Sequence, residues 1–462
     1  MNRVFTAERT GSHLTSEINK DFALDVARKA VKRGASAAEV VIRHRTEFSV
    51  GVRLGEVETL QESTDRGLGL RVLIEGKQAS VSGSDFSRQA LDTLIADAIE
   101  LARATSPDDS AGLPGIDEFA TEIADLDLYD TDIAALSPED KIELALRAEE
   151  AARDYSPLIV NFDGGGFDST SGAMILANSF GFTGEYSGTS CSLVTVPVAA
   201  EDGKMQRDYW YDVRRKFKEL DSPEQIGITA ARRTLRKLGA RPVATQNVPV
   251  VFEPNIARDL LGDIFTAISG ESIFRKSSFL VGQLGERVAS ECLTIIDDGT
   301  APGRLGSRPF DGEGLTTRRT TVISRGVLES YLLNTYTGRK LGLKSTGNAS
   351  RGLVGVPSVE PGNLYVQPGE HSPAEIIGSL SKGFLVTELI GFGVNIVTGD
   401  YSRSASGIWI ENGELSFPVQ GVTIAGNLKE MLNSIEMVGN DLDYRGSILS
   451  PTLLIGQMTV SA

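Results

Sequence analysis

The chain has 462 residues, 40% of them hydrophobic and 23% charged, which suits a globular protein with two domains. Its net charge of −16 argues against direct contact with nucleic acid, because the phosphate backbone attracts clustered Lys and Arg. The chain has only Cys191 and Cys292, no apolar core of a signal peptide and no apolar run of about 20 residues that would span a bilayer, so we expect a cytoplasmic protein without membrane contact.

The first hundred residues predict a helix, a sheet and a second helix. Apolar residues recur at helical spacing over 18–33 and over 87–104. Between these helices, Val-rich runs at 39–46, 48–61 and 67–74 predict three strands. This order is typical of a two-layer α/β unit.

Residues 105–140 carry eleven acidic side chains and no Lys or Arg, which predicts a solvated and flexible connection. Two further helices are expected to begin at Ser137 and Ser222, because each serine is a good N-cap and is followed by proline. Strands and turns are expected between them. The basic clusters at 214–218 and 232–237 lack a nucleic-acid motif and are interpreted as solvated helix faces that neutralise the acidic connection.

A break rich in Gly and Pro at 240–247 predicts the main domain boundary. We therefore expect an N-terminal α/β domain over 1–240 and a sheet-rich C-terminal domain over 248–462, which together make an α+β fold. Strands in the second domain are expected at 248–252, 320–323, 363–366, 407–410 and 419–425, and helices at 256–268, 373–380 and 428–435.

The acidic pairs Asp297-Asp298 and Asp311-Gly-Glu313 are the remaining polar motifs with a chemical interpretation. They carry oxygen ligands of the kind that Mg²⁺ or Ca²⁺ prefers. Their Gly and Pro neighbours favour a role as turn residues instead. Neither a Gly-x-Ser-x-Gly motif nor a phosphate-binding loop occurs.

Residues 391–414, here called the signature segment, read GFGVNIVTGDYSRSASGIWIENGE, and residues 417–441 read FPVQGVTIAGNLKEMLNSIEMVGND. This sequence resembles the C-terminal signature of the TldD/PmbA family. Residues 295–317 and the run STGNASR at 345–351 are similar to other parts of that family. The pieces occur in family order and cover most of the chain.

The resemblance implies a family built around a zinc peptidase, in which one branch carries a His-Glu-x-x-x-His motif. The matching positions here are Glu253, Pro254 and Arg258, and an Arg side chain cannot lose its proton to become a metal ligand. The tail over 444–458 also lacks the cysteine of the metal-bearing branch. The chain therefore looks like the PmbA (TldE) branch, with no cofactor of its own and zinc expected in a TldD-like partner.

The resemblance further implies a heterodimer with that partner, enclosing a chamber in which small or unfolded peptides are cleaved. Candidate contacts to substrate or partner are Asn348, Arg351, Asp400, Tyr401 and Ser402. The polar run at 398–404 fits a turn between two strands equally well. The alternative function is a non-proteolytic, homodimeric regulator of the gyrase-modulator type. An independent hydrolase is disfavoured because no nucleophile–base pair can be assigned.

Overall fold

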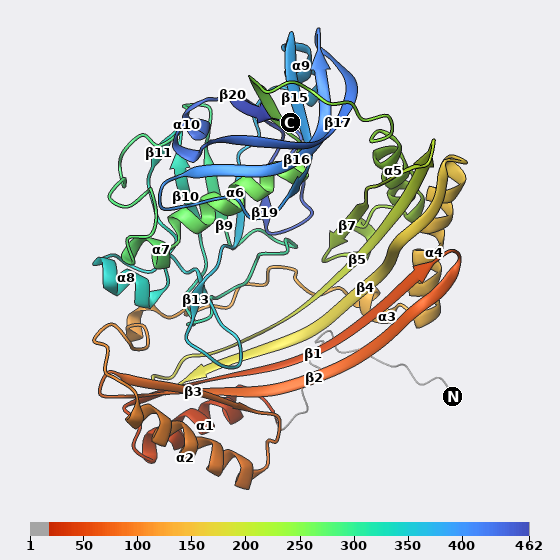
Figure 1. The fold of residues 1–462 in the computed structure, drawn as a ribbon. Coiled ribbons are helices and arrows are strands. Elements are labelled where there is room, and N and C mark those ends of the chain that lie inside the picture. Colours follow the sequence, from red (N-terminus) through yellow and green to blue (C-terminus); the bar gives the residue numbers. More distant parts are fainter. Residues whose placement is uncertain (1–17, 462) are drawn as a thin grey trace, which may run out of the picture.

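The computed structural model describes residues 18–461. Its N-terminal half is built on one long, curved sheet (Figure 1). The strands of this sheet are β1 (Ala37–Arg53), β2 (Glu56–Ile74), β3 (Lys77–Gly83), β4 (Ile159–Asn178), β5 (Thr183–Glu201), β6 (Lys204–Arg207) and β7 (Trp210–Arg214). They lie in the order β3-β2-β1-β4-β5-β6, and β7 also pairs with β5. All pairings in this sheet are antiparallel.

The three strands predicted over 39–74 are wrong in number, because this region forms only β1 and β2. The chain reverses at Leu54 and Gly55, whose φ angles are 54° and 82°. Most of the first half of β2 is exposed, so it lacks the alternation that burial imposes on a strand. Its backbone pairing with β1 holds it in the sheet instead.

Helices cover the two ends of this sheet (Figure 1). They are α1 (Lys20–Lys32), α2 (Arg88–Ala104), α3 (Thr131–Ala135), α4 (Pro138–Tyr155) and α5 (Pro223–Leu235), with short 3-10 helices η1 (Ile116–Glu118) and η2 (Phe217–Glu219). Val40 packs on α1 and α2, whereas Val41 points to the opposite face and packs near Phe310 of the C-terminal half. The predicted caps Ser137 and Ser222 are confirmed.

Two sheets form the frame of the C-terminal half. The larger contains β8 (Gln246–Phe252), β15 (Lys382–Ile390), β16 (Asp400–Glu411), β17 (Glu414–Asn427), β18 (Ile435–Val438) and β20 (Leu453–Ser461). Its order is β17-β16-β15-β8-β20-β18, and an added β17–β20 pairing closes five of these strands into a ring. The smaller sheet, in the order β11-β10-β9-β14-β19, contains β9 (Ile295–Asp298), β10 (Arg319–Ser324), β11 (Val327–Leu328), β14 (Asn363–Val366) and β19 (Ile448–Leu449).

The helices of this half are α6 (Pro254–Ile268), α7 (Gly270–Phe274), α8 (Thr335–Leu341), α9 (Pro373–Gly378) and α10 (Leu428–Asn433), and a separate pair of strands is β12 (Ala349–Ser350) with β13 (Ser358–Val359). The largest hydrophobic core joins α6 to residues of both sheets. The predicted α+β class is confirmed. Within residues 18–461, no helix is both long and apolar enough to cross a bilayer.

The acidic connection over 105–140 is not simply solvated, as the sequence predicted, because it packs along the C-terminal half. Leu126 is buried, and its carbonyl accepts a 2.8 Å hydrogen bond from the amide of Gly303. Asp108 forms a 2.8 Å ion pair with Lys340. The Lys340 hydrogen bond is the main reason why the pKa of Asp108 falls to about 2.

The basic cluster at 214–218 neutralises part of this segment, as predicted, but it spans the end of β7 and the 3-10 helix η2 and is not the solvated helix face that the sequence suggested. Lys216 forms a 2.6 Å ion pair with Asp127 and donates a hydrogen bond to the carbonyl of Tyr129. The Asp127 side chain is well exposed, whereas the Lys216 side chain is largely buried. The ion pair therefore attaches the acidic segment to the long sheet.

A candidate groove beside helix α6

Helix α6 has one apolar face and one polar face. Pro254 occupies its first turn, where a missing N–H costs nothing. Its apolar residues Ile256, Leu260, Leu261 and Ile264 enter the C-terminal core. The polar residues recur at the complementary helical positions 258, 259, 262, 263 and 266.

The polar face of α6 forms one wall of an open groove of about 620 Å³. Two loops and the strands β16 and β19 complete it. The lining residues are Arg258, Asp259, Gly262, Asp263, Thr266, Gly391, Phe392, Val394, Arg403, Gly446, Ser447 and Ile448. Residues that are far apart in the sequence therefore meet here, and part of the signature segment is among them.

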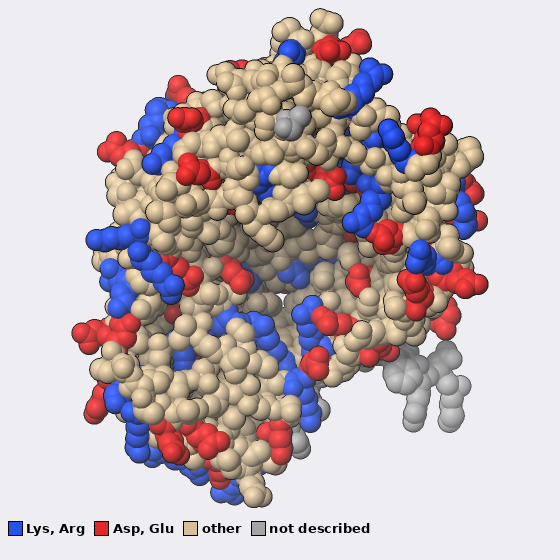
Figure 2. Space-filling model, in the orientation of Figure 1, with Lys and Arg blue, Asp and Glu red and all other residues tan. Residues whose placement is uncertain are grey.

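A second cavity of about 420 Å³ adjoins the groove at Arg258. Its other lining residues are Ser192, Val194, Tyr209, Tyr211 and Arg445, so it lies over β5 and β7 of the long sheet. In the space-filling view, a hollow separates the part built on the long sheet from the C-terminal part, with Lys and Arg side chains along its edge (Figure 2). Arg258 donates to the hydroxyl of Tyr211 and, at 3.4 Å, to the carbonyl of Arg445.

Charged side chains of α5 bind the residue that precedes α6. Arg233 donates to Glu253 at 2.6 Å and Arg236 does so at 3.1 Å. Arg233 also lies 3.5 Å from Asp208. Burial lowers the pKa of Arg233, but the carboxylates of Glu253 and Asp208 outweigh this effect and raise it overall.

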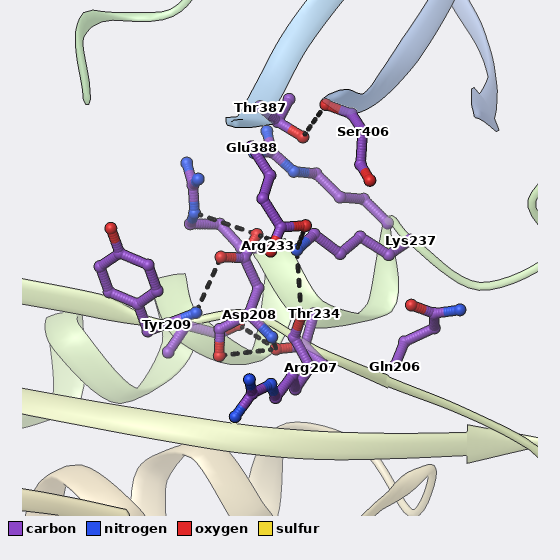
Figure 3. Close-up of polar contacts among 12 residues, drawn as sticks. Gln206, Arg207, Asp208, Tyr209, Arg233, Thr234, Lys237, Thr387, Glu388 and Ser406 are labelled. Carbon is purple, nitrogen blue, oxygen red and sulfur yellow. Dashed lines mark hydrogen bonds and ion pairs between the residues drawn. The ribbon is translucent and has the colours of Figure 1, made fainter. Parts of the chain in front are cut away.

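Lys237 extends this network to a further strand of the C-terminal half (Figure 3). Its ammonium group lies 2.9 Å from Glu388 of β15 and 3.5 Å from Asp208. Three cations and three carboxylates thus balance at the junction between α5 and the C-terminal half, because Arg233, Arg236 and Lys237 face Asp208, Glu253 and Glu388. A buried charge is tolerated when it is paired in this way.

The groove wall contains a second charged group around Asp263. Arg403 lies 3.6 Å from Asp259, whereas the Oδ2 atom of Asp263 has no hydrogen-bond donor within residues 18–461. Desolvation raises the pKa of Asp263 to about 6. The sequence analysis missed Asp259, Asp263 and Arg403, although the helical spacing of the polar residues of α6 pointed to the first two.

Comparison with known proteins places most of the chain in one family. Models of the PmbA/TldA metallopeptidases match domain 1 at residues 38–102, the central domain at 131–238 and the C-terminal domain at 245–462. The chain is a member of the PmbA/TldD metallopeptidase family. It is 39% identical to the Metalloprotease PmbA of Escherichia coli O157:H7 over 95% of each chain.

Solved structures of this family have the same fold. A proposed modulator of DNA gyrase from Bacteroides thetaiotaomicron is 30% identical, with a TM-score of 0.90 over 97% of this chain and 99% of that one. TldE from Thermococcus kodakarensis is 22% identical, with a TM-score of 0.86 over 95% of this chain and 99% of that one. At 22% identity, the likeness to this TldE structure shows a shared fold only.

The residues at the positions that the resemblance assigns to the metal motif do not fit a zinc ion. Glu253 already pairs with two guanidinium groups, whose charge would repel a dication. Pro254 has no side chain that accepts a proton, and Arg258 is a permanent cation. Within residues 18–461, no group of three or more His, Cys, Asp or Glu side chains is placed to hold a metal. His13 lies outside these residues.

None of the five predicted contact residues lines the groove. Asn348 is buried, and its amide donates to Asp297 at 2.7 Å. Arg351 is also buried and lies 2.6 Å from Glu39 of the long sheet. Arg351 therefore links the two halves of the chain, whereas Asn348 holds segments of the C-terminal half together. A role of either residue in contacting substrate or partner stays a prediction.

Asp400, Tyr401 and Ser402 begin strand β16, so the polar run at 398–404 is a turn only as far as Gly399, whose φ is 89°. Asp400 and Ser402 are exposed. Tyr401 is buried in the core behind the groove, and burial raises the pKa of its hydroxyl. Their contact with peptide or partner also stays a prediction.

Asp311 serves as a turn residue, which confirms one of the two interpretations of its motif. Its carboxylate accepts backbone hydrogen bonds from Glu313, Leu315 and Ala349. Glu313 accepts a 2.8 Å hydrogen bond from the amide of Thr335, at the first turn of α8. These carboxylates organise the loops that face the long sheet.

Proposed function

We propose that this chain is a non-catalytic subunit of a PmbA/TldD-type metallopeptidase, which works with a zinc-bearing TldD-like subunit to cleave small or unfolded peptides. The observation that carries the proposal is the environment of Glu253. Two guanidinium groups bind its carboxylate at the position where the metal-bearing branch has its first histidine. This arrangement supports a structural role for the motif positions.

The chain's contribution would be a substrate-binding wall. The groove beside α6 and the cavity over β5 and β7 share Arg258, so an extended segment could lie along both. Zinc in the partner would polarise the peptide carbonyl and activate water. The residues of this chain would orient the peptide and limit its freedom, and such positioning contributes strongly to rate.

Coexpression with a TldD-like paralogue tests this proposal. We expect the two chains to copurify and to cleave an unstructured peptide, whereas this chain alone should neither cleave it nor contain stoichiometric zinc. A matched preparation should carry Gln in place of the Glu of the paralogue's His-Glu-x-x-x-His motif, and it should lose cleavage while still copurifying. Cleavage by this chain alone, or failure of the pair to assemble, would contradict the proposal.

A second candidate is a non-proteolytic regulator that acts as a homodimer. The observation in its favour is the likeness to the Bacteroides protein proposed to modulate DNA gyrase. The net charge of −16 favours contact with a protein over contact with DNA. The purified chain would then form a dimer in solution and change the supercoiling activity of gyrase without cleaving any peptide.

A further inference from the structure

The groove beside α6 contains a carboxylate, that of Asp263, with one oxygen that accepts no hydrogen bond within residues 18–461. We propose that Asp263 binds the amino-terminal ammonium group of a peptide lying in this groove. The inference rests on the proposed function, because it assigns a substrate class to the wall that this chain contributes. The inference gives the bound peptide one orientation, in which its free amino end lies beside α6.

The partners of the charged side chains in the groove favour a cationic ligand at Asp263. Arg403 pairs with Asp259 at 3.6 Å, and Arg258 donates to Tyr211 and to the carbonyl of Arg445. Asp263 also feels the charge of Arg403, but its Oδ2 atom accepts no hydrogen bond within residues 18–461. An ammonium group brings three donors and a positive charge, and therefore satisfies what the carboxylate lacks.

Unpartnered polar atoms concentrate at this point of the structure. Besides Asp263 Oδ2, the Tyr401 hydroxyl and Arg403 Nε are buried and form no hydrogen bond of good geometry within residues 18–461, although the Tyr401 and Arg403 side chains interact with each other. Such atoms are uncommon in folded proteins, and each calls for an explanation such as a bound ligand. The terminal torsion of an Asp side chain is broad, so its carboxylate can turn toward the groove at small cost.

The apolar part of the groove suits the first side chain of the peptide. Phe392, Val394 and Ile448 line it together with Asp263. Phe392 is fully exposed in the isolated chain, at 109% of its reference area. A bound apolar side chain would cover part of that ring and gain from the burial. The opposite orientation would place a carboxylate end against Asp263, and the two like charges would repel each other.

Fluorescence anisotropy with two matched peptides tests the assignment on the purified full chain. Both peptides have the sequence Leu-Ala-Gly-Ala-Gly-Lys, with fluorescein on the Lys side chain. One has a free amino terminus and the other is acetylated. We expect the free peptide to bind at least about tenfold more tightly, because acetylation removes a charge-assisted hydrogen bond.

Two variants locate the effect. Asp263→Asn keeps the shape of the side chain but removes its charge, and it should lower affinity for the free peptide to that for the acetylated one. Asp97→Asn, an exposed change on α2, should leave the discrimination intact. Melting temperatures of both variants should match that of the unmodified chain, which excludes unfolding as the cause.

Equal affinity for the two peptides, absence of binding, or discrimination that survives Asp263→Asn would each overturn the inference. These outcomes are separable from failure of the proposed function. Copurification and cleavage with the TldD-like chain, combined with equal binding of the two peptides, would overturn only the role of Asp263. Discrimination by the isolated chain without assembly of the pair would support the groove and overturn the subunit assignment.

Discussion

Arg233 of α5 donates a 2.6 Å hydrogen bond to the carboxylate of Glu253, the residue that precedes α6. This contact joins the half built on the long sheet to the C-terminal half. It also surrounds a metal-motif position with positive charge, since Arg236 binds the same carboxylate. The ion pair of Arg233 with Glu253 therefore joins two parts of the fold and surrounds Glu253 with positive charge.

Restoring the two histidines should not create a zinc site. Glu253→His combined with Arg258→His leaves Arg233 and Arg236 beside the new ligand, and two guanidinium groups disfavour a dication. We expect much less than one zinc per chain by elemental analysis of the purified double variant. Stoichiometric zinc that survives dialysis against a weak chelator would contradict this expectation.

Removing Arg233 should destabilise the protein. Arg233→Met leaves the charges of Asp208 and Glu253 only partly compensated, by Lys237 and Arg236, in a largely buried place, at a cost of about 3 kcal/mol in the free energy of unfolding. Denaturant unfolding measures the loss. The matched control is Arg325→Met, because its pair with Glu291 is well exposed and such pairs contribute less than about 1 kcal/mol. Equal losses in the free energy of unfolding of the two variants would show that the buried network stabilises the protein no more than an exposed ion pair does.

Tyr401 separates packing from substrate contact. Tyr401→Ala should cost about 3–5 kcal/mol, because a large side chain is removed from the core. Tyr401→Phe should lower the melting temperature far less, because it removes only the hydroxyl, whose interaction with Arg403 lacks good hydrogen-bond geometry. Cleavage rates of the coexpressed pair then decide its role. If Tyr401→Phe slows cleavage without altering stability or copurification, the hydroxyl acts on the substrate.

Glu313 should make stability depend on pH. Burial, followed by the nearby charge of Asp311, raises the pKa of Glu313 to about 7, although hydrogen bonding to Thr335 and the charge of Arg71 oppose the shift. The folded state therefore binds a proton between about pH 4.5 and pH 7 that the unfolded state has lost. The free energy of unfolding must fall as the pH rises through this window.

The variant Glu313→Gln should remove this part of the pH dependence. At pH 5 its melting temperature should be close to that of the unmodified chain. At pH 8 it should gain stability relative to the unmodified chain, by at most roughly 3 kcal/mol, because the buried charge is absent. Glu370→Gln, at an exposed position, is the control and should follow the unmodified chain at both values. Parallel curves for all three proteins would show that Glu313 does not titrate in this range.

The sequence predicted local features better than it predicted the site. The serine caps of α4 and α5 and the helical period of α6 are encoded within a few neighbouring residues, and all three were predictable. The first half of β2 escaped prediction, because pairing with β1 rather than burial keeps it extended. Its polar residues carry no two-residue pattern of hydrophobicity.

The groove could not be derived from any one segment. Asp263, Phe392, Arg403 and Ile448 belong to a helix, a loop and two strands, and only the tertiary fold brings them together. Tyr401 shows a different limit. Its buried position beside Ala405 in β16 follows the two-residue period of a strand, yet its polar neighbours suggested a surface role.

The ring of five strands has a consequence for how this protein is made. Strand β8 spans residues 246–252, but one of its two sheet neighbours, β20, is formed by residues 453–461. During translation, β8 leaves the ribosome about 200 residues before β20 does. Until β20 is synthesised, β8 lacks this sheet neighbour and part of its apolar surface stays exposed. The C-terminal half therefore cannot complete its core before the last strand is synthesised. A chain truncated before β20 should aggregate instead of folding into a shorter functional protein.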